Sequence, residues 1–442
     1  MTKVGFISLG CSKNLVDTEV MLRRLHDAGF EITPDETEAE IIVVNTCGFI
    51  ESAKQEAIDN ILDAAKLKEW GKCRHIIATG CLVERYREEV MRELPEIDAL
   101  VGVGSLCDIA EACEAVMRGE KYTSFRDKNT SQLGGDRILT TDEHTAYLKI
   151  AEGCDNKCTY CAIPLIRGVM RSRSIEDIVA EARDLEALGV KELNLIAQDT
   201  SRYGVDLYGE YSLTRLVREI CKATNIPWIR LLYCYPDKIT DELIEELREN
   251  PRLLKYMDIP IQHISDSVLK RMNRHGGKEL ICGVVKKLRE RVPGIVLRTT
   301  AMVGFPGESE EDFCELCQFI KDAKFDRFGA FTYSEEEGTA AADLDGKIDE
   351  QTKQDRYDIL MQTQLTVTEE QNALKVGNTY TVICDGFDTV AEVYYGRSYA
   401  DAPDVDGRVY FTSKQKVNTG DFAEVKITEA IDYDLVGIKV EK

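Results

Sequence analysis

Apolar residues along the first part of the chain follow the pattern of strands alternating with helices. Short apolar runs at Val4–Leu9, Ile41–Thr46, His75–Thr79 and Ala99–Val103 are separated by stretches with helical spacing. Strands that alternate with helices favour a parallel sheet with helices on both faces. The pattern therefore predicts an open parallel α/β sheet as an N-terminal domain, residues 1–118.

A second alternation of strands and helices predicts a central domain over residues 140–371. Six such units favour an open, partial (β/α)6 version of the eight-unit barrel. A polar stretch with little periodicity, residues 118–143, predicts a linker before it, and a long polar helix at about 349–374 leads away from it. The expected barrel strands are Leu148–Glu152, Glu192–Ala197, Trp228–Leu232, Tyr256–Ile261, Gly294–Val303 and Arg327–Thr332.

The tail, residues 374–442, changes to short strands separated by Gly, Asn and Asp. Five short strands in so few residues predict a small β-barrel of the OB type. The expected strands are Thr379–Cys384, Ala391–Tyr395, Val409–Phe411, Phe422–Ile427 and Leu435–Val440. The fold class is therefore α/β, with a small all-β domain at the end.

Composition and charge indicate the cellular compartment and the kind of partner. The apolar runs are too short to span a membrane, and the N-terminus lacks a signal-peptide pattern, so we expect a cytoplasmic protein. Fifteen cysteines in a reducing compartment argue for metal ligation or buried thiols. A net charge of −23 suits a basic protein partner, and it argues against nucleic acid as the main substrate because phosphate contacts need Lys and Arg.

Three cysteines after the first barrel strand form a candidate metal site. Cys154, Cys158 and Cys161 lie in the run C-D-N-K-C-T-Y-C, with no fourth cysteine directly after it. Iron–sulfur clusters are held by cysteine thiolates, and a cubane has four irons. Three ligands would leave one iron open for another molecule, whereas a structural zinc site would want a fourth Cys or His nearby. The spacing predicts a 4Fe-4S cluster with an open iron.

Three other cysteines share a position relative to predicted strands. Cys11, Cys47 and Cys81 each follow a strand of the N-terminal sheet. The carboxyl ends of parallel strands meet at one edge, where ligands bind, and the N-termini of the following helices favour thiolates. We therefore expect a second metal centre. The alternative is three buried thiols, since cysteine suits strand ends.

At these motifs the chain resembles a known family. Its domain order and motifs resemble the methylthiotransferases among the radical S-adenosylmethionine (SAM) enzymes, with a TRAM domain as the tail. Within that family it resembles the branch that acts on protein twelve of the small ribosomal subunit. The motifs are S-L-G-C-S-K-N-L-V-D-T-E at 8–19, V-N-T-C-G-F-I at 44–50, T-G-C at 79–81, A-E-G-C-D-N-K-C-T-Y-C at 151–161, D-I-P-I-Q-H at 258–263 and Y-A-D-A-P-D-V-D-G at 399–407.

The resemblance implies cofactors and a reaction. It implies two 4Fe-4S clusters and SAM, with SAM held on the open iron and cleaved to a 5′-deoxyadenosyl radical. The radical would remove hydrogen from the β-carbon of an aspartate in the ribosomal protein. The cluster on Cys11, Cys47 and Cys81 would carry the sulfur, and a second SAM would supply the methyl group. An electron donor such as flavodoxin or ferredoxin is implied as well.

Five further residues are candidates for binding SAM. Tyr160 lies between two cluster cysteines and could contact the adenine, or simply pack the loop. Gly304 and Gly307 lie in G-F-P-G-E after the fifth barrel strand, where glycines let the backbone approach a ligand. Gln198 follows the second strand at the end where barrel sites form. Arg298 lies within a strand and could instead be structural.

Two alternative functions remain, and the tail bears on one of them. A tRNA methylthiotransferase would perform the same chemistry on an adenosine, and a non-catalytic electron carrier would hold two clusters without needing an open iron. Asp401, Asp404 and Asp406 share one loop of the tail. Clustered carboxylates repel phosphate, so we expect this loop to dock the basic ribosomal protein. The alternative is a solvated turn.

Overall fold

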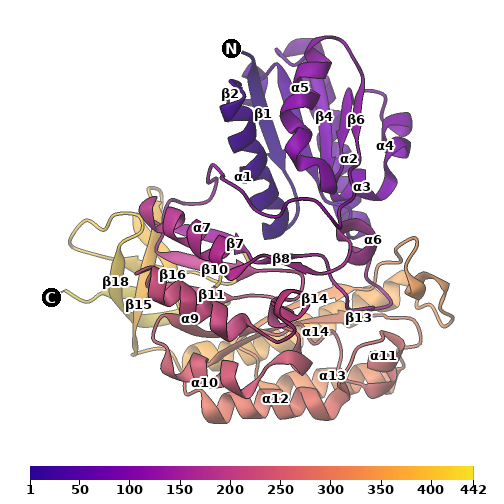
Figure 1. Ribbon diagram of the computed structural model, residues 1–442. Coiled ribbons are helices and arrows are strands. Elements are labelled where there is room, and N and C mark those ends of the chain that lie inside the picture. Colours follow the sequence, from indigo (N-terminus) through magenta and orange to yellow (C-terminus); the bar gives the residue numbers. More distant parts are fainter. Residues whose placement is uncertain (442) are drawn as a thin grey trace.

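The computed structural model describes residues 1–441, which form three main sheets (Figure 1). The N-terminal sheet is parallel throughout, in the order β2-β1-β3-β4-β5-β6. Its strands are β1 (Lys3–Ser8), β2 (Glu31–Ile32), β3 (Ile41–Thr46), β4 (His75–Gly80), β5 (Ala99–Val101) and β6 (Tyr122–Ser124). Its helices are α1 (Ser12–Asp27), α2 (Glu51–Trp70), α3 (Cys81–Tyr86), α4 (Glu88–Glu93) and α5 (Ile109–Met117), with 3-10 turns η1 (Glu36–Glu38) and η2 (Val103–Asp108).

Helices cover both faces of this sheet, as the alternation predicts. Strand β3 is buried along its whole length because each face has its own core. One core packs Ile42 and Val44 against α2, α3 and α4. The other packs Ile41 and Val43 against α1 and α5. The sheet extends past residue 118, because β6 pairs with β5 inside the segment expected to be a linker.

The central sheet is the expected partial barrel. It is parallel, in the order β14-β13-β12-β11-β10-β7. Its strands are β7 (Thr145–Lys149), β10 (Glu192–Ile196), β11 (Trp228–Leu231), β12 (Leu253–Asp258), β13 (Val296–Val303) and β14 (Arg327–Thr332). The outer layer consists of α7 (Ile175–Ala187), α8 (Val205–Tyr208), α9 (Leu213–Ala223), α10 (Asp241–Glu249), α11 (Asp266–Arg271), α12 (Gly277–Arg291), α13 (Glu310–Ala323) and α14 (Glu350–Ala373), with η3 (Thr200–Arg202), η4 (Pro236–Lys238) and η5 (Ala340–Asp343). The short helix α6 (Ile163–Arg167) instead packs against α3 of the N-terminal lobe.

Two barrel strands differ most from their predicted limits. Leu148–Glu152 is not one strand, because β7 ends at Lys149 and Ala151–Glu152 forms β8, which pairs antiparallel with β9 (Arg171–Ser172). This small ribbon encloses the loop that carries the cysteine motif. β12 begins at Leu253, before the predicted start, since the apolar pair Leu253–Leu254 is buried with it.

The tail is a closed barrel in the order β15-β16-β17-β19-β18. Its strands are β15 (Thr379–Asp388), β16 (Val393–Ser398), β17 (Val409–Thr412), β18 (Phe422–Ile431) and β19 (Asp434–Lys439). The long helix α14 connects it to the central barrel, and Figure 1 places the tail beside β10 and β11. No helix among residues 1–441 is both long and apolar enough to cross a membrane.

The expectation that the aspartate loop of the tail docks a basic partner is wrong for Asp401 and Asp406, whose carboxylates are buried, whereas Asp404 is exposed. Asp401 is 1% exposed and forms an ion pair with Arg327 at the start of β14. Asp406 accepts a hydrogen bond from Tyr256 Oη at 2.6 Å, and Asp404 accepts one from Tyr147 Oη at 2.9 Å. The barrel lumen contains buried arginine and tyrosine side chains, and the loop supplies their partners, so these carboxylates join two parts of the same chain.

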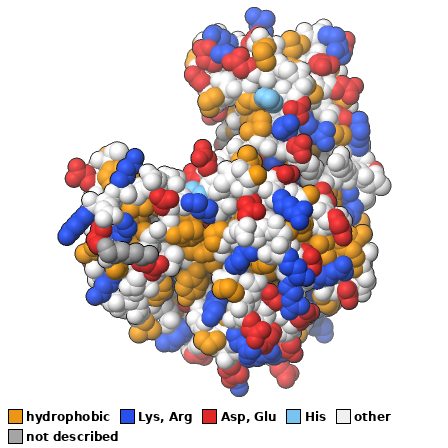
Figure 2. All heavy atoms as spheres, turned by 60° about the vertical axis from the view of Figure 1, so that its left-hand side comes forward, with side chains coloured by type: hydrophobic (Ala, Val, Ile, Leu, Met, Phe, Trp, Pro, Cys, Tyr) orange, Lys and Arg blue, Asp and Glu red, His pale blue; other side chains and the backbone are white. Residues whose placement is uncertain are grey.

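The negative net charge is not gathered into one patch on the face drawn in Figure 2. Acidic and basic side chains are interspersed there over the N-terminal lobe and the barrel. Many of them form surface ion pairs, such as Arg218 with Glu242 and Glu246. Interspersed charges of both signs keep a surface soluble.

Candidate functional site

The N-terminal sheet brings its three predicted cysteine ligands to one edge. β1, β3 and β4 are neighbours, so Cys11, Cys47 and Cys81 follow adjacent strand ends. A Cβ atom placed on Gly10 would lie 3.1 Å from Cys47 Sγ, so that thiol packs directly against the turn that carries Cys11. Cys81 is the first residue of α3. The grouping predicted from topology is therefore present.

These thiols need a positive partner in order to ionise. Burial raises the pKa of Cys81 to about 12, although the Arg167 guanidinium opposes this shift. Burial also raises the pKa of Cys47. A thiol that binds a metal is deprotonated outright, because the ion's charge dominates the site. The donor set therefore fits a bound metal centre better than free thiolates.

The second triplet lies in the loop between β8 and α6. The loop is held by main-chain hydrogen bonds from Cys154 N to Gly168 O and from Cys161 N to Cys158 O, both 3.1 Å long. Burial raises the pKa of Cys154 to about 11 and that of Cys161 to about 12. Cys158 Sγ lies 3.2 Å from Tyr235 Oη, on the loop after β11. The loop is thus ordered and turned toward the barrel.

The spread of the thiols fits a cluster better than a single ion. Among residues 1–441, the one set of three candidate ligand atoms that all lie within 4.8 Å of one another is Asp142, His144 and Asp385, and it contains no cysteine. Sulfurs bound to one zinc at roughly 2.3 Å would lie closer together than that. A cubane of four irons spreads its ligands more widely. The spacing of the thiols therefore does not match three ligands of one zinc ion, and that either triplet holds a cluster stays a prediction.

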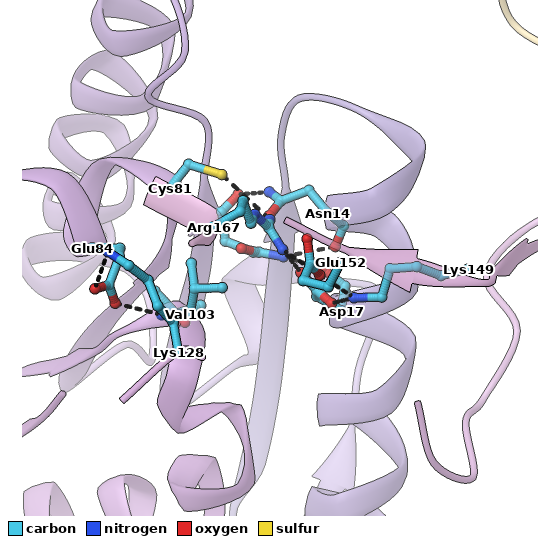
Figure 3. Close-up of polar contacts among 12 residues, drawn as sticks. Asn14, Asp17, Cys81, Glu84, Val103, Lys128, Lys149, Glu152 and Arg167 are labelled. Carbon is cyan, nitrogen blue, oxygen red and sulfur yellow. Dashed lines mark hydrogen bonds and ion pairs between the residues drawn. The ribbon is translucent and has the colours of Figure 1, made fainter. Parts of the chain in front are cut away.

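A buried polar network around Arg167 joins the two triplets (Figure 3). Arg167 follows Cys161 by six positions and donates to Cys81 Sγ at 3.3 Å and to Asn14 Oδ1 at 3.0 Å. The same guanidinium contacts two buried carboxylates, Asp17 and Glu152, which also bind Lys149. Figure 3 shows Arg167 between the cysteine and the carboxylates. The network holds the N-terminal lobe in one position on the barrel.

A cavity of about 920 Å³ lies beside both cysteine sites. One wall is Phe49–Ser52, two residues after Cys47, and the other is Tyr160 with residues of β13 and β14, including Thr300. Glu336, in the loop after β14, binds Arg85 of the N-terminal lobe at 2.7 Å, which fixes the two walls relative to each other. This is the space that a substrate could occupy.

Several buried polar atoms of β10 and the loop after it have no hydrogen-bond partner in the described part of the chain. Both side-chain polar atoms of Asn194, Gln198 Oε1 and Thr200 Oγ1 are in this state. Asn194 shares its register with Tyr147 and Arg230, which face the barrel interior. Buried polar groups are normally hydrogen-bonded. A polar ligand in the barrel, such as SAM, would supply the missing partners.

The five residues predicted to bind SAM do not all lie at the same place in the structure. Tyr160 lines the cavity, and its hydroxyl accepts a hydrogen bond from Arg274 at 3.1 Å. Gln198 donates to Glu152 at 2.5 Å and keeps its oxygen unpaired. Arg298 faces the lumen but does not line the cavity, and it forms ion pairs with Asp258 and Asp406. A role for each of them in binding SAM stays a prediction.

The G-F-P-G-E turn is held by its own chain. Gly304 N donates to Glu308 Oε2 and Gly307 N to Gly346 O, both at 2.8 Å. Both glycines have positive φ, +74° and +82°, and a Cβ atom on either would collide with Lys353 or Arg271. These contacts explain the glycines without a ligand, so their predicted contact with SAM is not tested.

Sequence reasoning missed three residues of the site. Arg167 was hidden because its partners, Cys81 and Asp17, are far away in sequence. The basic run R-G-V-M-R-S-R after the cysteine motif was a signal that could have singled it out. Tyr235 and Asn194 carried no such signal, since an aromatic residue after a strand and a polar residue within one are common.

Three family models match the chain. Residues 3–102 match "Uncharacterized protein family UPF0004", residues 148–320 match the Radical SAM superfamily, and residues 376–440 match the TRAM domain. These regions correspond to the N-terminal sheet, the partial barrel and the closed barrel. The match to the Radical SAM superfamily agrees with a 4Fe-4S cluster and SAM as cofactors.

Similar proteins cover the whole chain. A protein of Thermoanaerobacter sp., named ribosomal protein uS12 methylthiotransferase RimO, is 49% identical over 438 residues, covering 99% of this chain and 100% of its own. One of the same name from Clostridium perfringens is 52% identical over 440 residues, with 99% and 98% coverage. In fold, the chain is similar to the radical SAM methyltransferase TsrM of Kitasatospora setae, with a TM-score of 0.55, 14% identity and coverage of 77% and 74%. The chain belongs to the radical SAM methylthiotransferase family, in the branch of the RimO proteins.

Proposed function

We propose that this protein adds a methylthio group to the β-carbon of an aspartate in ribosomal protein uS12, using SAM and two 4Fe-4S clusters. Cys154, Cys158 and Cys161 would hold the cluster that binds SAM. Cys11, Cys47 and Cys81 would hold the cluster that provides sulfur. The name shared by the relatives supports the substrate, and the two cysteine triplets support the pair of clusters.

The observation that carries the proposal is the juxtaposition of the two triplets. Arg167 joins the loop of the second triplet to Cys81 of the first, at 3.3 Å. The cavity beside them has walls from both lobes, Phe49–Ser52 and Tyr160. A carrier of electrons has no need of a substrate-sized space between its clusters. Transfer of a sulfur group to a carbon requires that radical, carbon and sulfur lie close together.

The side chains of the protein bind and orient the ligands and shield the barrel lumen from water. When bound, SAM and the two clusters supply the radical, sulfur and methyl chemistry, which no side chain can provide. The unpaired polar atoms of Asn194, Gln198 and Thr200 provide contacts for a polar ligand in the barrel. Helix α1 covers the mouth of the barrel, with Val16 packed on Tyr147 and Ile196. This contact limits the access of water to the lumen.

The net charge of the chain supports a basic protein as its substrate. The chain carries a net charge of −23, and ribosomal proteins that sit in RNA are basic. Electrostatic attraction therefore favours encounter with uS12 and disfavours tRNA. Reductive cleavage of SAM needs one electron, so a small electron-transfer protein such as flavodoxin or ferredoxin is proposed as a second partner.

The test offers both substrates to the same enzyme. The full chain is reconstituted with iron and sulfide under anaerobic conditions. It is then given SAM, a chemical reductant, and either purified uS12 or unmodified tRNA. Intact-mass spectrometry of uS12 and nucleoside analysis of tRNA detect a methylthio group. We expect the modification on an aspartate of uS12 and none on tRNA.

Two variants test whether the modification comes from this enzyme and its proposed cluster ligands. Cys158→Ala removes a proposed cluster ligand and should abolish modification. Cys107→Ala is the matched control, because Cys107 is an exposed cysteine outside both triplets, and it should retain full activity. A methylthio group on tRNA but not on uS12 would replace this proposal with the tRNA reaction. Modification by the Cys158 variant would contradict the assigned ligands.

A further inference from the structure

Lys13 is a buried cation without a partner. Its residue is 8% exposed, and its ammonium lies over the Tyr233 ring, 3.2 Å from the centroid. Within residues 1–441, its Nζ has no carboxylate within 4.0 Å and makes no hydrogen bond. A buried charge is costly unless it is paired. The ammonium is thus held against an aromatic ring, with no counterion among the described residues.

The other buried cations show that this state is unusual here. Lys149 is shared between Asp17 and Glu152. Arg274, which also lacks a carboxylate, donates to Tyr160 Oη at 3.1 Å and to Pro260 O at 2.6 Å. Lys13 alone among the buried lysines and arginines of the described residues has no acceptor at all. Its partner is therefore to be sought in a ligand.

Lys13 lies close in sequence to one cysteine site and contacts a residue close to the other. Lys13 is two residues after Cys11, in the first turn of α1, and this turn is at the end of α1 that lies nearest the barrel in Figure 1. Tyr233 follows β11 at the mouth of the barrel, two residues before Tyr235, whose hydroxyl lies 3.2 Å from Cys158 Sγ. The ammonium accordingly lies on Tyr233, and its two neighbours along the chain lead to Cys11 in one lobe and to Tyr235 beside Cys158 in the other.

We propose that Lys13 binds the side-chain carboxylate of the aspartate that the enzyme modifies, and that it thereby selects aspartate as the target. The inference rests on the proposed function. The carbon that receives sulfur is bonded directly to the carboxylate carbon. When the β-carbon of the aspartate meets the sulfur provided beside Cys11, the carboxylate carbon lies one bond away from that β-carbon. The carboxylate is therefore held close to Cys11 as well. A buried ammonium two residues from Cys11 is placed to pair with this charge.

The geometry also restricts the alternatives. Arg298, another cation of the barrel lumen, already binds Asp258 and Asp406. Arg167 is occupied by Asp17 and Glu152. An ion pair that forms only in the complex adds specificity, because a neutral side chain in its place would leave the ammonium unpaired. Lys13 would therefore reject asparagine, which has the same shape but no charge.

The experiment is a double-mutant cycle between enzyme and substrate. Reconstituted wild-type and Lys13→Met enzymes are each given uS12 and uS12 with its target aspartate changed to asparagine, and kcat/KM and Kd are measured. In the wild type, the asparagine substrate should lose about thirtyfold or more in kcat/KM, as expected when one partner of a buried pair is removed. In Lys13→Met, the same change should matter less than about threefold.

Control variants make the outcome specific. Lys13→Arg keeps the charge and should keep the preference for aspartate, and Lys270→Met, which removes an exposed lysine, should behave as wild type. Lys13→Gln serves as a second neutral variant if Lys13→Met fails to bind iron.

Three outcomes would overturn the inference. They are equal use of both substrates by the wild type, an unchanged preference in the neutral variants, or a raised KM for SAM as their only defect. The last would assign the ammonium to the carboxylate of SAM. A wild-type enzyme that does not modify uS12 at all would instead refute the proposed function.

Discussion

Replacing Arg167 with Met should strongly destabilise the joint between the N-terminal lobe and the barrel. The side chains of Arg167, Asp17 and Glu152 are 2%, 4% and 4% exposed, so none of their charges is screened by water. Without the guanidinium, two buried carboxylates would share the single charge of Lys149. Removing one partner of a buried pair costs about 3–5 kcal/mol. That cost should lower the urea midpoint by about 1 M or more.

The assay is urea unfolding of the thiol-reduced apoprotein, followed by circular dichroism. Arg218→Met is the matched control, because Arg218 also binds two carboxylates, Glu242 and Glu246, but is 44% exposed. A surface pair of this kind contributes about 1 kcal/mol or less. If Arg167→Met shifted the midpoint no more than Arg218→Met, the network would not be what holds the two lobes together.

The effect should also depend on pH in a defined direction. Burial by itself disfavours the charged form of Glu152, but Lys149 and Arg167 outweigh it and hold its pKa below the usual value. A depressed carboxyl pKa stabilises the fold above the unfolded pKa of about 4.3, and this contribution is lost as the pH falls toward the folded pKa. The difference between wild type and Arg167→Met should therefore be largest near neutral pH and shrink below about pH 4.

Three further predictions concern the cysteines and the tail. Anaerobic reconstitution should give about eight irons per chain, two cubanes of four, and changing Cys11, Cys47 and Cys81 together to Ala should halve that value; unchanged iron would make these thiols structural. Cys158→Ala should abolish 5′-deoxyadenosine formation while the other cluster remains, and undiminished SAM cleavage would contradict its role. Asp401→Asn should leave Arg327 buried without a counterion and lower stability by about 3–5 kcal/mol, with the salt dependence of uS12 binding unchanged; a flattened salt dependence would return the aspartate loop to the role of docking surface.

The fold was predictable because each region has a strong local pattern. The fully buried run Ile41–Thr46 and the period of β and α elements are enough to indicate parallel sheets. What could not be predicted were features decided by distant pairing. β6 is too short to recognise without its neighbour β5, and the split after Lys149 depends on the antiparallel contact with Arg171–Ser172.

The candidate site was predictable only where spacing or topology constrains it. C-x3-C-x2-C is a local motif, and Cys11, Cys47 and Cys81 follow from the order of parallel strands. The docking role predicted for the aspartate loop failed for Asp401 and Asp406 because composition does not reveal whether a carboxylate meets solvent or a buried arginine. Asp401 finds Arg327, 74 residues away in the chain. Lys13 is distinctive only because its ammonium has no carboxylate or hydrogen-bond acceptor nearby, and a sequence pattern cannot show this.

The most direct test of the central claim is made in the cell. Ribosomal protein uS12 is purified from the native organism with and without this gene and measured by intact-mass and fragment mass spectrometry. The account predicts a methylthio group on the β-carbon of one aspartate in the presence of the gene, its loss when the gene is deleted, and its return with the wild-type gene but not with Cys158→Ala. An identical uS12 mass with and without the gene would contradict the account.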